Sequence, residues 1–134
     1  MRPEGVMRTT ILGLLLLTSS AGCVNVLEPI GKRPANEQEI RWAASVYPLV
    51  ADCLAMDNFH HEVRYWVVRS LRGGGENIRG GAHQRGDIYV VEDFYRPYTL
   101  RHEIMHHVLW RNTGDGDSNH RHPGWRECGD PRYG

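Results

Sequence analysis

The stretch His102-Glu103-Ile104-Met105-His106 decides what this chain builds. On an α-helix, residues four apart lie on one face, so His102 and His106 can reach the same metal ion. Zn²⁺ takes imidazole nitrogens at about 2.0–2.1 Å and favours four tetrahedral ligands. Glu103 follows His102 at about 100° around the helix, where it can accept a proton from water on the metal. The pattern predicts two helix-borne zinc ligands with a general base between them.

The flanks of this motif indicate a buried helix. Apolar residues fall on two sides of it, which are Leu100, Ile104 and Val108 on one side and Tyr98, Met105 and Leu109 on the ligand side. Such a helix is normally enclosed in a core, where imidazoles and carboxylates are costly unless they are paired, hydrogen-bonded or metal-bound. The alternative is a surface helix that carries His and Glu by chance. His107 points about 100° away from His106, so we expect it at the helix surface.

A catalytic zinc site needs a third protein ligand, and the segment after the helix offers four candidates: His120, His122, Asp115 and Asp117. The spacing Asp115-x-Asp117-x-Asn119 resembles the start of a calcium loop. However, His120 stands where such a loop needs Gly, and Arg126 stands where it needs Glu. We therefore expect the acidic residues to cap helix ends or to orient a ligand imidazole.

The amino-terminal residues 1–22 read as a bacterial secretion signal, with Arg8 before the apolar run 11–17. That run is too short to span a bilayer of about 30 Å. The sequence Ser20-Ala21-Gly22-Cys23 resembles a lipobox, which implies that Cys23 becomes the lipid-modified first residue. No Asp follows Cys23, so the resemblance favours the outer membrane, facing the periplasm. The alternative is ordinary cleavage and a soluble periplasmic product.

Removing residues 1–22 leaves 112 of the 134 residues, enough for one domain. We expect residues 23–35, with two prolines and a glycine, to be a tether and residues 36–134 to form the domain. Taking away the two Arg and one Glu of the signal leaves 14 of 16 basic and 15 of 16 acidic residues. Such a balance gives no reason to expect a nucleic acid partner, and we expect a monomer held at the membrane by its lipid.

Two cysteines remain after Cys23, and an even number in an oxidising compartment favours pairing. We predict a disulfide between Cys53 and Cys128. It would close a loop of about 75 residues and stabilise the fold by about 4 kcal/mol in the chain-entropy model. A cysteine nucleophile and a cysteine zinc ligand are the alternatives.

The remaining pattern outlines a small α+β domain. Asn36 and Glu39 have the form of a capping box, which predicts the start of a helix. Residues 64–68 and 87–91 are rich in β-branched and aromatic residues and predict short strands. A third strand is expected near residues 82–85. Pro97 suits the first turn of the motif helix and Gly114 its carboxyl-terminal cap.

The run Leu100–His107 and the later Pro123-Gly124-Trp125-Arg126-Glu127-Cys128, which a histidine precedes, are similar to segments of minimal zincins. These are short HExxH zinc metallopeptidases of the bacterial lipoprotein kind. The resemblance implies an α+β fold with an N-terminal helix, a small three-stranded sheet, a central HExxH helix and a C-terminal loop tied by a disulfide. By its place five residues before Trp125, it makes His120 the third ligand, with His122 as the alternative.

The same resemblance implies Zn²⁺ as cofactor and hydrolysis of peptide bonds in the cell envelope, with Glu103 as general base and a peptide or protein as substrate. The substrate would lie along the strand at residues 87–91. Four candidates could donate to the transition state: Tyr95, Tyr98, Arg101 and the spare histidine of the pair 120 and 122. Two other function classes stay open. A non-catalytic zinc-binding lipoprotein would not need Glu103, and a purely structural envelope domain would hold no metal.

Overall fold

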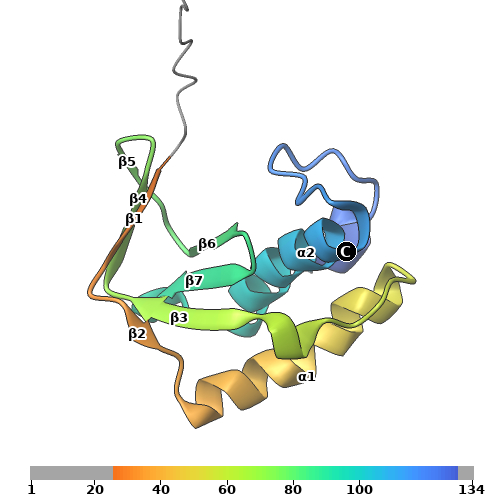
Figure 1. Cartoon of the computed structure of the whole chain (residues 1–134), viewed down its shortest axis with the longest axis horizontal. Coiled ribbons are helices and arrows are strands. Elements are labelled where there is room, and N and C mark those ends of the chain that lie inside the picture. Colours follow the sequence, from red (N-terminus) through yellow and green to blue (C-terminus); the bar gives the residue numbers. More distant parts are fainter. Residues whose placement is uncertain (1–25, 130–134) are drawn as a thin grey trace, which may run out of the picture.

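The computed structural model describes residues 26–129 (Figure 1). The strands are β1 (Leu27–Ile30), β2 (Arg33–Pro34), β3 (Arg64–Val68), β4 (Ser70–Gly73), β5 (Glu76–Asn77), β6 (Gly81–Gln84) and β7 (Asp87–Val91). The helices are α1 (Glu37–Cys53) and α2 (Pro97–Thr113), with short turns η1 (His60–Glu62), η2 (Glu92–Phe94) and η3 (Trp125–Gly129). The expected signal and the expected lipidation site, Cys23, lie outside the described residues. Among the described helices, none has the length and apolar character needed to cross a membrane.

The strands form two small sheets, so the expectation of one three-stranded sheet is wrong. One sheet has the order β1-β4-β5 and the other β2-β3-β7-β6. The expected strands at residues 64–68 and 87–91 are confirmed as β3 and β7, which pair in parallel, and the third appears as β6, antiparallel to β7. The sequence did not reveal β2 and β5 because each has only two residues, too few for an alternating pattern.

Residues 27–34, which lie within the segment expected to be a tether, are folded into these sheets. Strand β1 pairs with β4, and β2 pairs with β3. Pro29 argues against a strand in the sequence, but it is tolerated in β1 because β1 is an edge strand of its sheet. Leu27 packs against the buried cluster that includes Val68 and Leu71.

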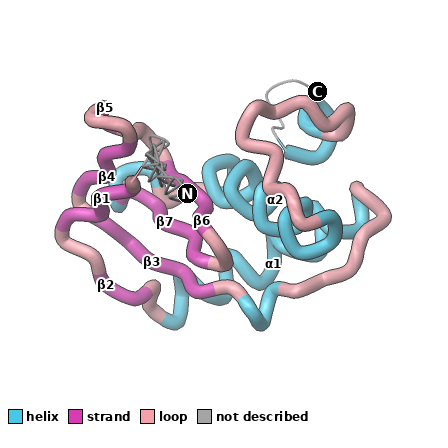
Figure 2. The backbone as a smooth tube through the Cα atoms, turned by 45° about the horizontal axis from the view of Figure 1, so that its top comes forward, coloured by secondary structure: helices cyan, strands magenta, loops and turns pink. Residues whose placement is uncertain are grey.

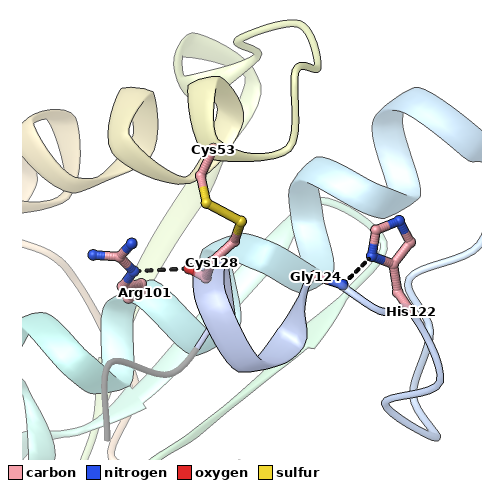
Figure 3. Close-up of a disulfide and its surroundings, with 5 residues drawn as sticks. All are labelled: Cys53, Arg101, His122, Gly124 and Cys128. Atoms are coloured by element: carbon pink, nitrogen blue, oxygen red, sulfur yellow. Dashed lines mark hydrogen bonds between the residues drawn. A yellow bond between two sulfur atoms is a disulfide. The ribbon is translucent and has the colours of Figure 1, made fainter. Parts of the chain in front are cut away.

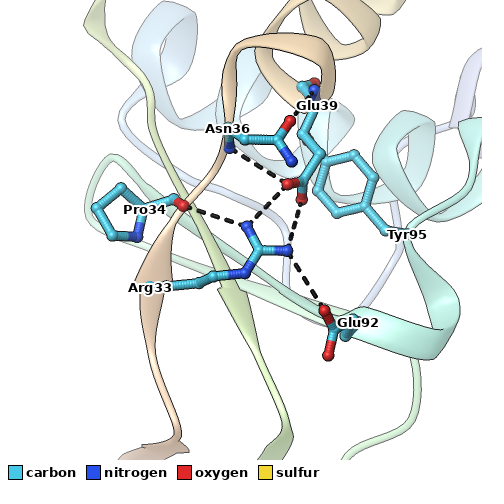
Figure 4. A network of polar contacts seen from close by, with 6 residues as sticks. All are labelled: Arg33, Pro34, Asn36, Glu39, Glu92 and Tyr95. Atoms are coloured by element: carbon cyan, nitrogen blue, oxygen red, sulfur yellow. Dashed lines mark hydrogen bonds and ion pairs between the residues drawn. The ribbon is translucent and has the colours of Figure 1, made fainter.

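The start of α1 carries the predicted capping box (Figure 4). The side chain of Asn36 accepts from the N–H of Glu39 at 2.9 Å, and the N–H of Asn36 donates to the Glu39 carboxylate at 3.2 Å. Arg33 of β2 donates to the same carboxylate at 2.8 Å and to Glu92 at 3.4 Å. Tyr95 donates its hydroxyl to the Glu39 carbonyl at 2.9 Å. These contacts fix the beginning of α1 to β2 and to the segment before α2.

The main core lies between the two helices and the four-stranded sheet. Figure 2 shows the strands gathered to one side and α1 and α2 packed together on the other. Five apolar side chains of α2 are at most 2% exposed: Leu100, Ile104, Met105, Val108 and Leu109. The prediction that the motif helix is enclosed on two sides is therefore confirmed.

The predicted disulfide joins Cys53, the last residue of α1, to Cys128 in η3, with Cα atoms 5.7 Å apart (Figure 3). Arg101 of α2 donates to the Cys128 carbonyl at 2.7 Å. The carboxyl-terminal segment is thus attached to both helices. This matters for the site, because the segment between α2 and η3 carries the remaining histidines of the motif region.

Candidate metal centre

Helix α2 presents His102 and His106 on one face, and the loop that follows returns to the same face. The helix begins at Pro97 and ends at Thr113, and its cap Gly114 has a φ of 83°, the left-handed conformation that glycine adopts readily. Both terminal signals read from the sequence are confirmed. The left-handed cap turns the chain back, so that the next six residues bring His120 over the two helix histidines.

Three histidine nitrogens converge in this structure. The Nε2 of His120 lies 3.1 Å from Nε2 of His102 and 3.2 Å from Nε2 of His106. The Nε2 of His120 carries at most one hydrogen, so it cannot donate a hydrogen bond to both neighbouring nitrogens. Two nitrogens on a tetrahedral ion at about 2.0–2.1 Å would be about 3.3 Å apart. These two separations match those of ligands on one ion, and all three nitrogens lie within 4.8 Å of one another, so the group could hold a metal.

The tautomer of His106 suits a ligand. Its Nδ1 lies 2.6 Å from the carbonyl oxygen of Gly116, and because that oxygen can only accept, Nδ1 carries the hydrogen. Burial lowers the pKa of His106 and favours the neutral ring. The lone pair is then on Nε2, which faces the other two rings. Proteins usually orient a metal-binding imidazole by a hydrogen bond from its other ring nitrogen to a carbonyl or carboxylate oxygen.

The loop that carries His120 is organised by Asp117. One oxygen of its carboxylate accepts from the N–H of Arg121 at 3.0 Å, and the other accepts from the N–H of His122 at 2.7 Å and the indole of Trp125 at 2.6 Å. Burial alone would raise the pKa of Asp117, but these three hydrogen bonds outweigh it and lower the pKa to about 2. Asp117 was expected to cap a helix end or orient a ligand imidazole, but its carboxylate instead holds two backbone N–H groups and the indole of the loop.

Trp125 packs against the three histidines. Its ring centroid is 4.9 Å from that of His102, 4.5 Å from that of His106 and 4.6 Å from that of His120. Because its indole N–H is held by Asp117, the large ring has one fixed position. The alternative ligand His122 lies outside the three-histidine group, and its Nδ1 accepts from the N–H of Gly124 at 3.0 Å (Figure 3).

Glu103 is 5% exposed and lines a cleft of about 440 Å³ together with the three histidines. Burial raises its pKa to about 8. A cation in the three-histidine centre would oppose that shift, because a nearby positive charge favours the carboxylate. Gly81 of β6 makes room for this side chain: a Cβ at that position would lie 3.0 Å from Cγ of Glu103 and 2.6 Å from the carbonyl of Tyr89.

His83 of β6 also lines this cleft, and the sequence analysis missed it. Its ring is stacked on that of His106, with centroids 6.5 Å apart and an interplanar angle of 11°. Burial lowers its pKa to about 3, so the ring is neutral. No motif marks this residue. It reaches the site only because the β6–β7 hairpin packs against α2, which is a property of the fold.

His107 is not at the helix surface, contrary to the expectation. It is fully buried, and its Nδ1 lies 2.8 Å from the hydroxyl of Tyr47 on α1. His107 does project about 100° away from His106, but that direction faces α1 instead of solvent. Its Nε2 is the only buried side-chain nitrogen or oxygen in residues 26–129 without a hydrogen-bond partner. Burial lowers the pKa of His107 to about 4, so the ring is neutral.

The structure shows where three of the candidate transition-state donors lie. Tyr95 and Arg101 are engaged elsewhere, at the carbonyls of Glu39 and Cys128. Tyr98 lines a second cleft of about 300 Å³ that also reaches Glu103. The expected substrate strand needs correction: β7 has β3 on one side and β6 on the other, so β6 is the edge of the sheet.

Comparison of the chain with protein-family models, with curated proteins and with solved structures gives no match.

Proposed function

We propose that this protein is a zinc-dependent peptidase of the zincin type that works in the bacterial cell envelope. The observation that carries the proposal is the convergence of the Nε2 atoms of His102, His106 and His120 beside the buried carboxyl of Glu103, all on one cleft. Three imidazole nitrogens that leave one position for water are a ligand set of catalytic zinc. Imidazole also suits copper, iron and nickel, so the identity of the metal is part of the proposal.

Bound zinc would supply a Lewis acid that polarises the substrate carbonyl and lowers the pKa of water to about 7. The chain supplies the proton transfers. Glu103 accepts a proton from the attacking water and passes it to the leaving amine. Because Glu103 is buried in a site with little water, a nearby positive charge changes the pKa of its carboxyl strongly.

The oxyanion that forms during attack needs a hydrogen-bond donor from the protein. His83 and Tyr98 support this role from the two ends of the site, since each lines a cleft that Glu103 also lines. His83 is neutral and therefore has one ring N–H to donate. We assign the donor role to these two residues in place of Tyr95 and Arg101.

The peptide substrate is proposed to lie along β6. In the antiparallel pairing of β6 with β7, Val91 donates to the carbonyl of Gly80 at 2.8 Å. Because hydrogen-bonded pairs alternate in an antiparallel ladder, the backbone groups of Gly81 and His83 point away from β7. An extended peptide can pair with them as an added strand. The edge position of β6, beside Glu103, supports this placement.

The cellular location is proposed on the sequence features alone. A secretion signal and a lipobox-like Cys23 would place the domain on the periplasmic face of the outer membrane. The Cys53–Cys128 disulfide supports an oxidising compartment. The second candidate function is a non-catalytic zinc-binding lipoprotein, which the three histidines alone would satisfy.

The experiment compares Glu103→Gln, His120→Ala and His122→Ala with the parent protein. Zinc content is measured by elemental analysis and cleavage by digestion of a peptide mixture. We expect Glu103→Gln to keep zinc and to lose about 10²–10⁴-fold in cleavage rate. His120→Ala should lose both zinc and cleavage, whereas its matched control His122→Ala should keep zinc. Full cleavage by Glu103→Gln would contradict the base role, and zinc binding without any cleavage by the parent would favour the second candidate.

A further inference from the structure

Two clefts meet at the three-histidine centre as two arms, and apart from Glu103, which lines both, the larger has acidic side chains and the smaller a basic one. The larger arm, of about 440 Å³, includes Asp115 and Asp117, and the smaller, of about 300 Å³, includes Arg79 with the rings of Phe94 and Tyr98. Three residues line both arms: Gly81, His102 and Glu103. The two arms therefore meet at the centre, and a ligand that crosses it must enter both.

The two arms differ in the part of β6 that lines them. Arg79 and Gly80, directly before the strand, line only the smaller arm, whereas Ala82 and His83 line only the larger one, which Ile78 also lines. The position of Arg79 is defined by its neighbour, because Gly80 has a φ of 91° and its carbonyl accepts from Val91. The exposed Arg79 therefore lies at the amino end of the edge strand β6, next to a residue that is hydrogen-bonded to β7.

A peptide added antiparallel to β6 would run from the acidic arm to the Arg79 arm. Its amino-terminal part would lie near Asp115 and its carboxyl-terminal part near Arg79. Antiparallel pairing is the more stable kind per residue. The charges of the arms match the ends of a peptide in this direction, positive at the amino end and negative at the carboxyl end. In a peptide that pairs in parallel with β6, each terminus would instead lie near an arm with charged side chains of its own sign.

We propose that the arm formed by Arg79, Phe94 and Tyr98 is a subsite for a carboxylate on the carboxyl-terminal side of the scissile bond. The carboxylate is the free α-carboxylate of a short peptide or the side chain of an acidic residue, and the two aromatic rings pack against the apolar part of that residue. This inference rests on the proposed function, and it names the substrate class as peptides with a negative charge after the cleaved bond.

The test uses two end-capped hexapeptides of identical composition. One has Lys in its amino-terminal half and Glu in its carboxyl-terminal half, and the second has these two residues exchanged. Binding is measured by calorimetry with the zinc-loaded full chain carrying Glu103→Gln, and cleavage is measured with the parent protein. Arg79→Glu and Arg79→Gln test the subsite. Arg72→Glu is the control, because Arg72 is an exposed arginine of β4 that lines neither arm.

We expect the first peptide to bind about three- to tenfold more tightly at low salt, with a smaller difference at high salt. Arg79→Gln should remove most of the preference and Arg79→Glu should reverse it, while Arg72→Glu leaves it unchanged. Equal binding of the two peptides, binding of neither, or a preference that survives Arg79→Glu would overturn the subsite. A preference in binding without any cleavage would instead leave the subsite in place and reject the hydrolytic function.

Discussion

At the scale of single residues, Asp117 organises the loop that carries His120 although it lies outside the three-histidine group. Its two oxygens receive hydrogen bonds from Arg121, His122 and Trp125, and its carbonyl accepts from the N–H of His120 at 2.9 Å. Asp117 therefore holds both His120 and Trp125, whose ring packs against all three histidines. The spacing argued against a calcium loop, but it could not show that Asp117 holds the loop instead of capping a helix end or orienting an imidazole.

We expect Asp117→Asn to weaken zinc binding by about 10–100-fold, the usual cost of losing a group that orients a ligand. The amide nitrogen cannot accept the hydrogen bonds that one carboxylate oxygen now receives. A competition titration against a chromophoric chelator measures the affinity. Asp93→Asn, an exposed aspartate of η2, makes the same change of charge away from the loop and should leave the affinity unchanged. Unaltered affinity in Asp117→Asn would mean that His120 needs no support from the loop.

At the scale of elements, strong local signals were predictable and weak ones were not. The capping box of α1, the bounds of β3 and β7, and the Pro97 and Gly114 ends of α2 follow from local chemistry, and all are confirmed. The second sheet was missed because its strands are short, contain Pro29 or consist of exposed residues. The site shows the same division: the spacing identified the helix histidines, but the part played by β6 required the tertiary fold.

The contact of β6 with α2 depends on the absence of a side chain at Gly81. An added Cβ would meet the Tyr89 carbonyl at 2.6 Å and Cγ of Glu103 at 3.0 Å. We expect Gly81→Ala to lower the melting temperature by several degrees, in line with about 1–3 kcal/mol for overpacking, and to reduce peptide cleavage. Gly116→Ala is the control in the same cleft, because its nearest contact would be an ordinary 3.4 Å. Equal stability of both variants would show that β6 can shift without cost.

The parallel pair of β3 and β7 is reinforced by Asp87. Its carboxylate accepts from Arg64 at 2.6 Å and from the Trp66 indole at 2.9 Å. The hydrogen bond from Arg64, ahead of the opposing effect of burial, lowers the pKa of Asp87 below its ordinary value. A carboxyl with a lowered folded-state pKa stabilises the fold above its unfolded pKa of about 3.9, and this contribution is lost as the pH falls toward the folded-state value.

We therefore expect the melting temperature of the parent protein to fall more steeply below about pH 4 than that of Asp87→Asn, which has no proton to gain there. Thermal melts from pH 7 to pH 2 measure the difference. Glu76→Gln, an exposed carboxylate of β5, is the control and should follow the parent. Identical acid profiles for Asp87→Asn and the parent would show that this carboxyl does not couple folding to pH.

At the scale of the whole molecule, the histidine centre is held from both helices. Helix α2 carries His102 and His106. His120 lies in a loop that starts at the Gly114 cap and ends in η3, where Cys128 is bonded to Cys53 of α1 and its carbonyl accepts from Arg101. The disulfide prediction needed only the count of cysteines and the expected compartment. Its position at the far end of the loop that carries His120 connects it to the histidine centre, which the sequence did not suggest.

We expect the double variant Cys53→Ser/Cys128→Ser to be less stable by up to about 4 kcal/mol in the chain-entropy model and also to bind zinc more weakly. The second effect arises because η3 carries Trp125, and without the covalent bond the loop is held by weaker contacts alone. Chemical denaturation and chelator competition, each with and without the metal, measure the two effects separately. The single variant Arg101→Gln controls for the polar attachment of Cys128. Zinc affinity equal to that of the parent, in a variant that is folded but less stable, would confine the disulfide to a structural role and leave Asp117 and Trp125 as sufficient support for His120.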